Sequence, residues 1–238
     1  MKTLLDNRFA PVTFNYGFIE CPFLELSQAF TTWQRETDSS SGTQTELRCF
    51  QAPLGEALLS LEPLTSPLDR YLLVETRSAW TAIFANGLRV SDVFSPVSFL
   101  PTVLKCRGLE VVCVPDRSDG NTKDAFRVYG AVVFSLYGSQ QTDWLNRIRH
   151  LAVTNDVRGW EFVAQGEIQL FEKTENYQKR RIQERFTPEM LESYCAALGI
   201  RLLDADSYGG KCLLSHTRRT TPAGPTMSIS EARSRLYL

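Results

Sequence analysis

Few residues of this chain are spaced for a known chemistry. The two histidines, His150 and His216, stand beside no recognisable nucleophile, and the G-x-S-x-G pattern of serine hydrolases is absent. The pair Gly210-Lys211 suggests a phosphate loop, but Ala205 stands where that loop needs its first glycine. No dinucleotide fingerprint G-x-G-x-x-G follows an expected strand. A Ser/His/Asp or Cys/His site stays open, because such groups converge in space rather than along the chain.

Metal-binding patterns are also incomplete. Asp204 and Asp206 begin like a calcium loop, yet Tyr208 holds the third ligand position and Ser215 replaces the closing glutamate. The cysteines are scattered and form no C-x-x-C pair, so a zinc site is not expected. They are Cys21, Cys49, Cys106, Cys113, Cys195 and Cys212. We therefore predict no metal and no cofactor.

The charge of the chain is balanced overall and uneven along its length. The formal net charge of 238 residues is -1, so no global field attracts nucleic acid or anionic lipid. Residues 20–75 carry nine acids and three bases, a net charge of -6, whereas residues 209–238 carry five bases and one acid, a net charge of +4. The acidic segment is either solvated surface or a face that meets a basic partner.

A basic run near residue 180 is the one candidate for nucleic-acid contact. Lys179, Arg180 and Arg181 are interleaved with Glu175 and Glu184 at helical spacing. This pattern is typical of a solvated, salt-bridged helix, and the net charge does not support nucleic-acid binding. We expect no nucleic-acid partner.

The elements that must position these residues are strands mixed with helices. Apolar patterning predicts strands at 9–19, 46–51, 71–76, 80–85, 109–114 and 125–137, and one or two more within 160–170. Helices are predicted at 22–33, 54–61, 144–152 and 188–198, and a short helix within 94–107 is expected to start near Ser95 or Ser98. Short turns join neighbouring strands, so the expected fold class is α+β, with a mixed, largely antiparallel sheet and flanking helices.

The predicted domain organisation is one α+β domain over residues 1–215, with a division into two subdomains near 115–125 left open. Residues 216–238 are expected to form an extended C-terminal arm, because they contain Pro222, Gly224 and Pro225 and show no periodicity. The N-terminus lacks the apolar run of a signal peptide, and no stretch has the length of a membrane helix. We therefore expect a cytoplasmic protein with reduced cysteines.

Four blocks of the sequence resemble an uncharacterised bacterial family with an RFAP…YGF start. They are RFAPVTFNYGFIECPFLEL (residues 8–26), TDWLNRIRHL (142–151), YQKRRIQERFTPEMLESYCAALGI (177–200) and DADSYG (204–209). The resemblance covers most of the chain up to Leu214, and none of its motifs carries a catalytic role. Small α+β proteins of this kind are similar to immunity proteins of polymorphic toxin systems, including those of Rhs and type VI secretion.

That resemblance implies a non-enzymatic immunity protein, monomeric when free, that occludes the active site of a cognate bacterial toxin. An ADP-ribosyltransferase and a nuclease both fit as the toxin. Exposed polar positions are the expected partner contacts: Glu36, Asp38, Asp116, Arg117, Asp119, Arg233, Arg235 and Tyr237.

The alternative hypothesis is a small-ligand-binding protein or an enzyme with an unrecognised site. Its pocket would be lined by polar residues of the resembling blocks, namely Asp143, Arg147, Arg180, Arg181 and Tyr208.

Overall fold

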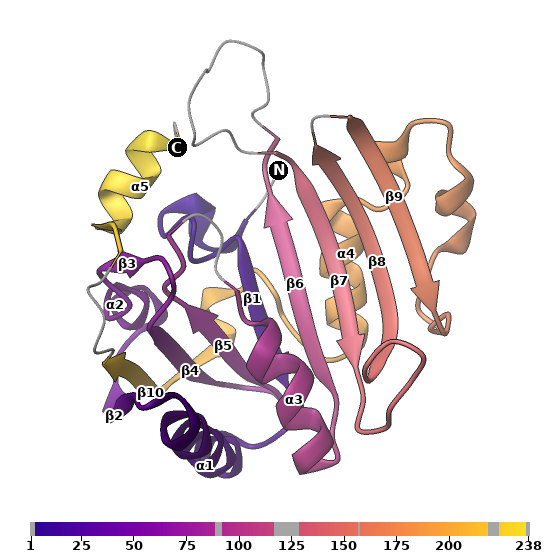
Figure 1. The fold of residues 1–238 in the computed structure, drawn as a ribbon. Coiled ribbons are helices and arrows are strands. Elements are labelled where there is room, and N and C mark those ends of the chain that lie inside the picture. The colour runs from indigo at the N-terminus through magenta and orange to yellow at the C-terminus, as the bar shows by residue number, and fades with distance from the viewer. Residues whose placement is uncertain (1–2, 89–91, 117–128, 157, 219–223, 237–238) are drawn as a thin grey trace.

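The fold is α+β, as the sequence predicts. The computed structural model describes residues 3–88, 92–116, 129–156, 158–218 and 224–236. These ranges contain one nine-stranded sheet in the order β2-β10-β4-β5-β1-β6-β7-β8-β9, and a two-stranded sheet of β11 and β3 (Figure 1). Every pair of neighbouring strands is antiparallel.

The strands of the large sheet are β1 (Asn15–Ile19), β2 (Gln44–Gln51), β4 (Arg70–Thr76), β5 (Thr81–Ala85), β6 (Gly108–Val114), β7 (Ala131–Tyr137), β8 (Arg147–Asp156), β9 (Gly159–Gly166) and β10 (Tyr208–Arg218). The small sheet consists of β3 (Leu64–Thr65) and β11 (Thr226–Met227). The α-helices are α1 (Phe23–Ser41), α2 (Leu54–Leu59), α3 (Phe94–Leu104), α4 (Pro188–Ala197) and α5 (Ile229–Arg235). Short 3₁₀ helices are η1 (Leu4–Asn7), η2 (Thr174–Gln178), η3 (Ile182–Glu184) and η4 (Ala205–Ser207).

Helices cover the two faces of the sheet unequally. Helices α1 and α3 pack on one face through Phe30, Val97 and Leu100, and α4 packs behind the sheet through Leu191 and Tyr194 (Figure 1). On the face of α1 and α3, strands β7, β8 and β9 extend beyond both helices (Figure 1). The sheet is therefore half covered on that face.

Two glycines let α3 lie directly on the central strands. A Cβ added to Gly17 would collide with Val97 Cγ2, and one added to Gly108 would collide with the Val97 carbonyl oxygen and lie 2.7 Å from Pro101 Cγ. Any larger residue would push α3 away from β1 and β6. The position of this helix thus follows from two small residues on neighbouring strands.

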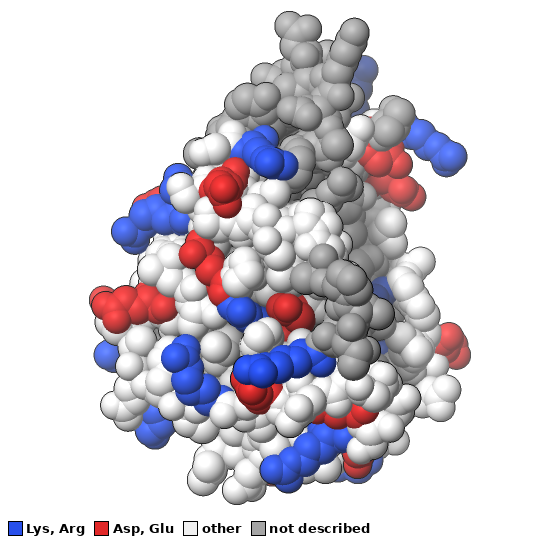
Figure 2. Space-filling view, turned by 60° about the vertical axis from the view of Figure 1, so that its left-hand side comes forward, with Lys and Arg blue, Asp and Glu red and all other residues white. Residues whose placement is uncertain are grey.

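Strand β10 inserts between β2 and β4, and it places the basic C-terminal segment beside the acidic one. Lys211 Nζ lies 2.9 Å from Glu75 Oε1, and Arg218 Nη2 lies 2.9 Å from Glu46 Oε1. His216 Nε2 lies 3.8 Å from an Asp69 oxygen. Acidic and basic side chains are interspersed on the side of the molecule shown in Figure 2. The two charged segments of the sequence therefore compensate each other within one chain.

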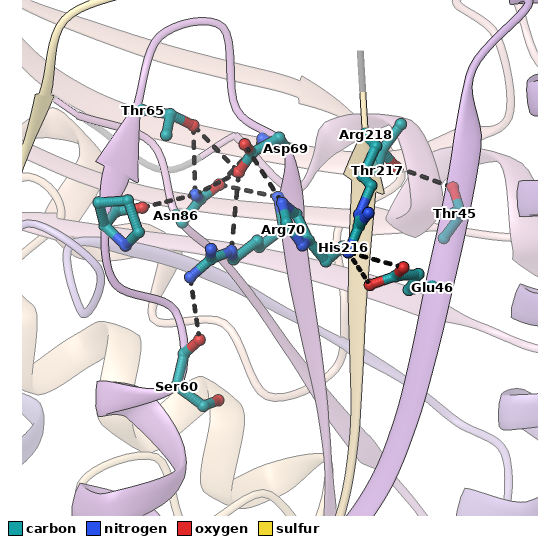
Figure 3. Close-up of polar contacts among 11 residues, drawn as sticks. Thr45, Glu46, Ser60, Thr65, Asp69, Arg70, Asn86, His216, Thr217 and Arg218 are labelled. Atoms are coloured by element: carbon teal, nitrogen blue, oxygen red, sulfur yellow. Dashed lines mark hydrogen bonds and ion pairs between the residues drawn. The ribbon is translucent and has the colours of Figure 1, made fainter. Parts of the chain in front are cut away.

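A buried asparagine fixes the loop that leads into β4. Asn86 is fully buried, and its Nδ2 donates to the Pro63 carbonyl oxygen at 2.9 Å and to Asp69 Oδ1 at 2.7 Å (Figure 3). Its Oδ1 accepts from the backbone N–H groups of Asp69 and Arg70 at 3.1 and 2.9 Å. This side chain satisfies backbone groups that would otherwise be buried without partners, so the network in Figure 3 has a structural role.

The described part of the C-terminal segment is not the extended arm that was predicted. Strand β10 continues to Arg218, β11 pairs with β3, and α5 buries Ile229 and Ala232, which are 3% and 1% exposed. The helix begins with a capping box in which the hydroxyl of Ser228 and the carboxylate of Glu231 bind each other's backbone N–H groups. This Ser-x-x-Glu signal is readable in the sequence and was missed.

The predicted helix at 144–152 is wrong, because residues 147–156 form β8. Ile148, Leu151 and Ala152 fit a helical face, yet Leu151 and Val153 also alternate with His150 and Ala152 at strand spacing. Pairing with β7 on one side and β9 on the other selects the strand. His150 consequently lies on a sheet face and not on a helix.

Other boundaries also differ from the sequence-based ones. Residues 8–14 form turns, so the first strand is only Asn15–Ile19. The segment around 177–185 forms η2 and η3 and not one helix, and its ion pair Arg181–Glu184 is exposed at 3.5 Å. Residues 125–128, the start of the predicted strand 125–137, lie outside the described residues.

Several local predictions are confirmed. The hairpin at 71–76 and 80–85 corresponds to β4 and β5. Helix α4 begins at Pro188, its cap Thr187 accepts a hydrogen bond from the Met190 N–H, and Gly199 follows the helix with φ of 82°.

A buried ion pair attaches the segment after β9 to the sheet. Arg149 donates to both carboxylate oxygens of Glu172 at 2.9 and 2.7 Å, and both side chains are at most 4% exposed. Tyr177 Oη donates to the same carboxylate at 2.7 Å and lies 3.1 Å from Tyr194 Oη on α4. Because the carboxylate has several donors, the cost of burying both charges is offset locally.

We predict that Ile229→Ala lowers the free energy of unfolding by at least about 2 kcal/mol, since it leaves a cavity where α5 packs on the core. Leu24→Ala, at a position 70% exposed, is the matched control and should change stability by less than about 0.5 kcal/mol. Chemical denaturation measures both. Equal unfolding midpoints for the two variants would show that α5 is not part of the core.

Candidate functional site

A polar row crosses the uncovered half of the sheet. Glu110 on β6 lies opposite Ser135 on β7, Ser135 lies opposite His150 on β8, and His150 lies opposite Gln165 on β9. Directly opposed residues of antiparallel strands point to the same face, so these four side chains share one surface. No described helix crosses β8 and β9 on this face, whereas α3 lies on β6 at Gly108 (Figure 1). The row is the first feature of the candidate site.

An apolar row runs parallel to the polar row on the same face, displaced from it by two residues on each strand. Val112, Val133, Ala152 and Val163 are opposed in the same way across β6 to β9. Ala152 is 5% exposed, and the three valines are partly exposed. The open face thus combines a hydrophobic strip with hydrogen-bonding groups, which is the usual composition of a binding surface.

Glu110 is a partly buried carboxyl group at one end of the polar row. Its Oε1 accepts from Asn15 Nδ2 at 3.1 Å, and its Oε2 accepts from Tyr137 Oη at 3.3 Å. Burial raises the pKa of Glu110, the nearby carboxylate of Asp92 raises it further, and the two hydrogen bonds and Arg147 oppose the rise. Asn15 is 7% exposed, and its buried Oδ1 accepts no hydrogen bond from the part of the chain that the structure describes.

Arg147 connects the polar row to the surface. A register shift between Leu136 and Tyr137 occurs where β8 begins, and Arg147 Nη2 donates to Tyr137 Oη at 3.1 Å. Its guanidinium carbon lies 3.6 Å from the centre of the Trp144 ring, a stacked cation–π contact. Its Nε and Nη1 are buried, and no described residue accepts a hydrogen bond from them. The guanidinium group therefore keeps unused donors beside an aromatic ring.

A pocket of about 270 Å³ opens next to this arginine. It is lined by Thr142, Asp143, Trp144, Arg147, Gln165 and Gly166. These residues come from the β7–β8 loop, the start of β8 and the end of β9, which only the sheet brings together.

His150 and Ser135 form a hydrogen-bonded pair in the middle of the row. Ser135 Oγ lies 2.9 Å from His150 Nδ1. Burial lowers the pKa of His150 to about 4, and Arg147 and Arg149 add to this effect. Ser135 is 1% exposed, and Glu110 is bonded to Asn15 and Tyr137 rather than to the imidazole. The Ser–His pair therefore lacks the accessible nucleophile and the oriented base of a hydrolase triad.

The loop between β7 and β8 projects two large apolar side chains from the edge of this face. Trp144 is 50% exposed and Leu145 is 52% exposed. The next residue, Asn146, is buried, and its Nδ2 donates to the carbonyl oxygens of Ser98 on α3 and Gly138 at 2.8 and 2.6 Å. Leu145 has a φ of 59°, a left-handed conformation that is uncommon for a residue with a branched side chain. The loop is thus anchored while its apolar residues stay exposed.

Sequence reasoning missed Trp144 and Leu145 as surface residues because it placed them on the apolar face of a helix. The dipeptide follows Thr142 and Asp143, which also fit a turn. Nothing in the local pattern identified Glu110, Ser135 or Tyr137 as site residues, because each lies in an otherwise apolar strand.

The predicted partner residues lie on separate elements. Glu36 is exposed on α1, and Asp116 is exposed just after β6, where it accepts hydrogen bonds from the Gly130 N–H and Asn155 Nδ2. Asp38, near the end of α1, accepts hydrogen bonds from the Thr43 and Thr45 hydroxyls and the Thr45 N–H. Arg233 and Arg235 are on α5. Arg117, Asp119 and Tyr237 lie outside the described residues.

Of the residues of the alternative hypothesis, Asp143 and Arg147 line the same pocket. Arg180 and Arg181 are exposed between η2 and η3. Tyr208 is 6% exposed and lines a different pocket of about 390 Å³ beside Arg77 and Asp206. The structure therefore brings together only two of the five.

Neither a metal site, a membrane-spanning helix nor a match to a known protein identifies the function of this chain within the described residues. Within the described ranges, no group of three His, Cys, Asp or Glu side chains is placed to hold a metal ion. None of the described helices has the length and apolar character to cross a bilayer. No protein-family model, curated protein or solved structure matches the chain. The function must be argued from the geometry of the open face.

We predict that His150 titrates near pH 4 in the folded protein, against about 6.5 for an exposed histidine. Since the unfolded chain binds this proton at higher pH, the stability contributed by the neutral ring is complete above about pH 6.5 and is lost as the pH falls toward 4. His150→Gln should reduce the change in unfolding free energy across this interval. The imidazole NMR signal that disappears in the variant identifies His150, and a midpoint near 6.5 would contradict the prediction.

Proposed function

We propose that this protein is a non-enzymatic immunity protein that binds a cognate bacterial toxin and blocks its active site, with the open sheet face and the β7–β8 loop as its contact surface. The toxin would be an enzyme such as an ADP-ribosyltransferase or a nuclease. The protein needs no chemistry of its own for this role, because inhibition requires only a complementary interface with a few buried anchors.

The observation that carries the proposal is the pair of exposed apolar residues on an anchored loop. Trp144 and Leu145 are each about half exposed, and Asn146 fixes the loop to α3 and to β7. A large side chain that is held in a left-handed conformation and left in solvent stabilises neither the backbone nor the core. Such a pre-organised anchor loses little conformational entropy when a partner buries it.

The composition around this loop also supports a protein partner. Trp, Tyr and Arg are the residues that most often dominate binding energy at interfaces, and Trp144 stacks on Arg147 at this position. The apolar strip of Val112, Val133 and Val163 lies on the adjoining face and would add buried area. The acidic segment contributes less than its net charge suggests, because Glu46 and Glu75 are paired with bases of β10.

We predict that Leu145→Gly weakens toxin binding without weakening the fold. Glycine adopts a φ of 59° readily, so thermal stability should be unchanged or higher, while loss of the anchor should raise the dissociation constant by roughly 30-fold. Trp144→Ala should have a similar effect on binding. Calorimetric titration and thermal unfolding of the same preparations measure the two quantities.

The test uses co-expression with toxin domains encoded beside the gene for this chain. The wild-type protein should restore growth and co-purify with one toxin, and Leu145→Gly should do neither fully. Leu24→Ala, on exposed α1, is the control and should protect as the wild type does. Failure to neutralise or bind any neighbouring toxin would refute the function, and equal protection by all variants would refute the surface.

A second candidate, binding of a small anionic ligand, is favoured by the pocket beside Arg147. Two guanidinium nitrogens of Arg147 donate to no described residue, and Gln165 and Thr142 line the same 270 Å³ space. A carboxylate or phosphate oxygen pairs well with a charged guanidinium donor, provided that Trp144 moves aside.

We predict for this candidate that a small carboxylate or phosphate ester raises the unfolding temperature of the wild type but not that of Arg147→Met. The reason is that a ligand that binds only the folded state stabilises it. A thermal-shift screen of anionic metabolites measures this effect. A screen in which no compound shifts the wild type would leave only the protein-binding proposal.

A further inference from the structure

Strand β2 forms one edge of the large sheet. Near its start Asp38 Oδ2 of α1 accepts the Thr45 N–H, and beyond Thr45 the edge pairs with no described strand. The strand is eight residues long, and six of them are exposed. Its sheet neighbour is β10, and no described strand pairs with its other side. An edge of this length presents unpaired backbone N–H and C=O groups that can pair with another strand.

The charges of β2 complement a second copy of the same strand. Glu46 and Arg48 are two residues apart and point to one face, the face on which Phe50 packs against the core. Thr45, Leu47 and Cys49 point to the other face, where Thr45 binds Asp38 of α1. Opposite charges that face each other across an antiparallel pair are favourable, and like charges are unfavourable.

Only one symmetric register uses both charges. An axis through Leu47 places Glu46 opposite Arg48 of the second copy and Arg48 opposite its Glu46. Leu47, which is 37% exposed, then meets its own copy at the centre. An axis through Glu46 or through Arg48 sets like charges directly against each other.

The current contacts of both side chains leave them able to form these pairs. Arg48 lies over the Phe50 ring at 5.0 Å, and no carboxylate within the described part of the chain pairs with it. Glu46 binds Arg218 in an exposed ion pair, and a carboxylate has further acceptor sites for a second cation. Charged residues on an edge strand commonly prevent it from pairing with other strands. Glu46 and Arg48 disfavour pairing with a strand that does not place opposite charges against them, but they favour pairing with a second copy of β2.

The opposite edge of the sheet lacks this property. Strand β9 carries Glu161 as its one charged residue, and no base is available to oppose it. Its terminal residues Gly159 and Gly166 have φ of 109° and 87°, so the ends depart from regular strand geometry. The self-complementary pattern is therefore specific to β2.

We propose that this protein forms a two-fold dimer through antiparallel pairing of β2 with β2 of a second copy, in the register centred on Leu47. This replaces the monomer expected from the sequence, and it is independent of the proposed toxin-binding surface, which lies at the other end of the sheet. The dimer would extend one continuous sheet through both chains.

Charge exchange between Glu46 and Arg48 tests the register. Sedimentation analysis of the full chain should show a concentration-dependent dimer for the wild type. Glu46→Arg alone and Arg48→Glu alone should be monomeric, because each opposes like charges. An equimolar mixture of these two variants should form a heterodimer, and the double variant should dimerise again. Recovery on mixing excludes misfolding as the cause of the loss.

Cross-linking provides a second readout. In a Cys49→Ser background, Leu47→Cys places two thiols on the symmetry axis, where opposed Cα atoms are about 4.5–5.5 Å apart and within disulfide range. A reducible covalent dimer should form on mild oxidation. Glu161→Arg on β9 is the control and should leave the dimer unchanged. A monomeric wild type, or a dimer insensitive to both charge reversals, would overturn the proposal.

Discussion

The insertion of β10 between β2 and β4 is the constraint on which the rest of this structure depends. It joins segments that are 172 residues apart at the Glu46–Arg218 pair. Because β10 pairs with a strand on each side, the residues that form it cannot be a detachable arm, and α5 packs against the core that this strand completes. The same insertion sets the basic segment against the acidic one and leaves β2 as the edge of the sheet.

The second constraint is the unequal cover of the two faces. Gly17 and Gly108 admit α3 onto β1 and β6, whereas the buried Arg149–Glu172 pair directs the chain after β9 to the opposite face, toward α4. Strands β7 to β9 therefore keep one open face. The anchored loop with Trp144 and Leu145 lies between α3 and the open face, and Asn146 binds it to the Ser98 carbonyl oxygen of α3. The proposed partner surface therefore depends both on its exposed residues and on the fact that α1 and α3 leave these strands uncovered.

The success of sequence-based prediction depended on how local the signals were. Helix α4 was identified because Thr187, Pro188 and Gly199 mark its start and its end within a few residues. The segment 144–152 failed because its apolar spacing satisfies a helix and a strand equally, and only the neighbours β7 and β9 decide between them. The capping box of Ser228 and Glu231 is an equally local signal. The sequence analysis missed it because the prolines and the glycine that precede it favoured an extended C-terminal arm.

The sequence by itself determined the α+β class and most strand positions, since these depend on composition and on patterns a few residues long. It did not determine the candidate site. Glu110, Ser135 and His150 are separated by 25 and 15 residues, and only strand register places them in one row. Likewise, the exposure of Trp144 and the compensation of the charged segments are decided by which strands pair. Tertiary structure sets these features because contact between distant residues carries no local signal.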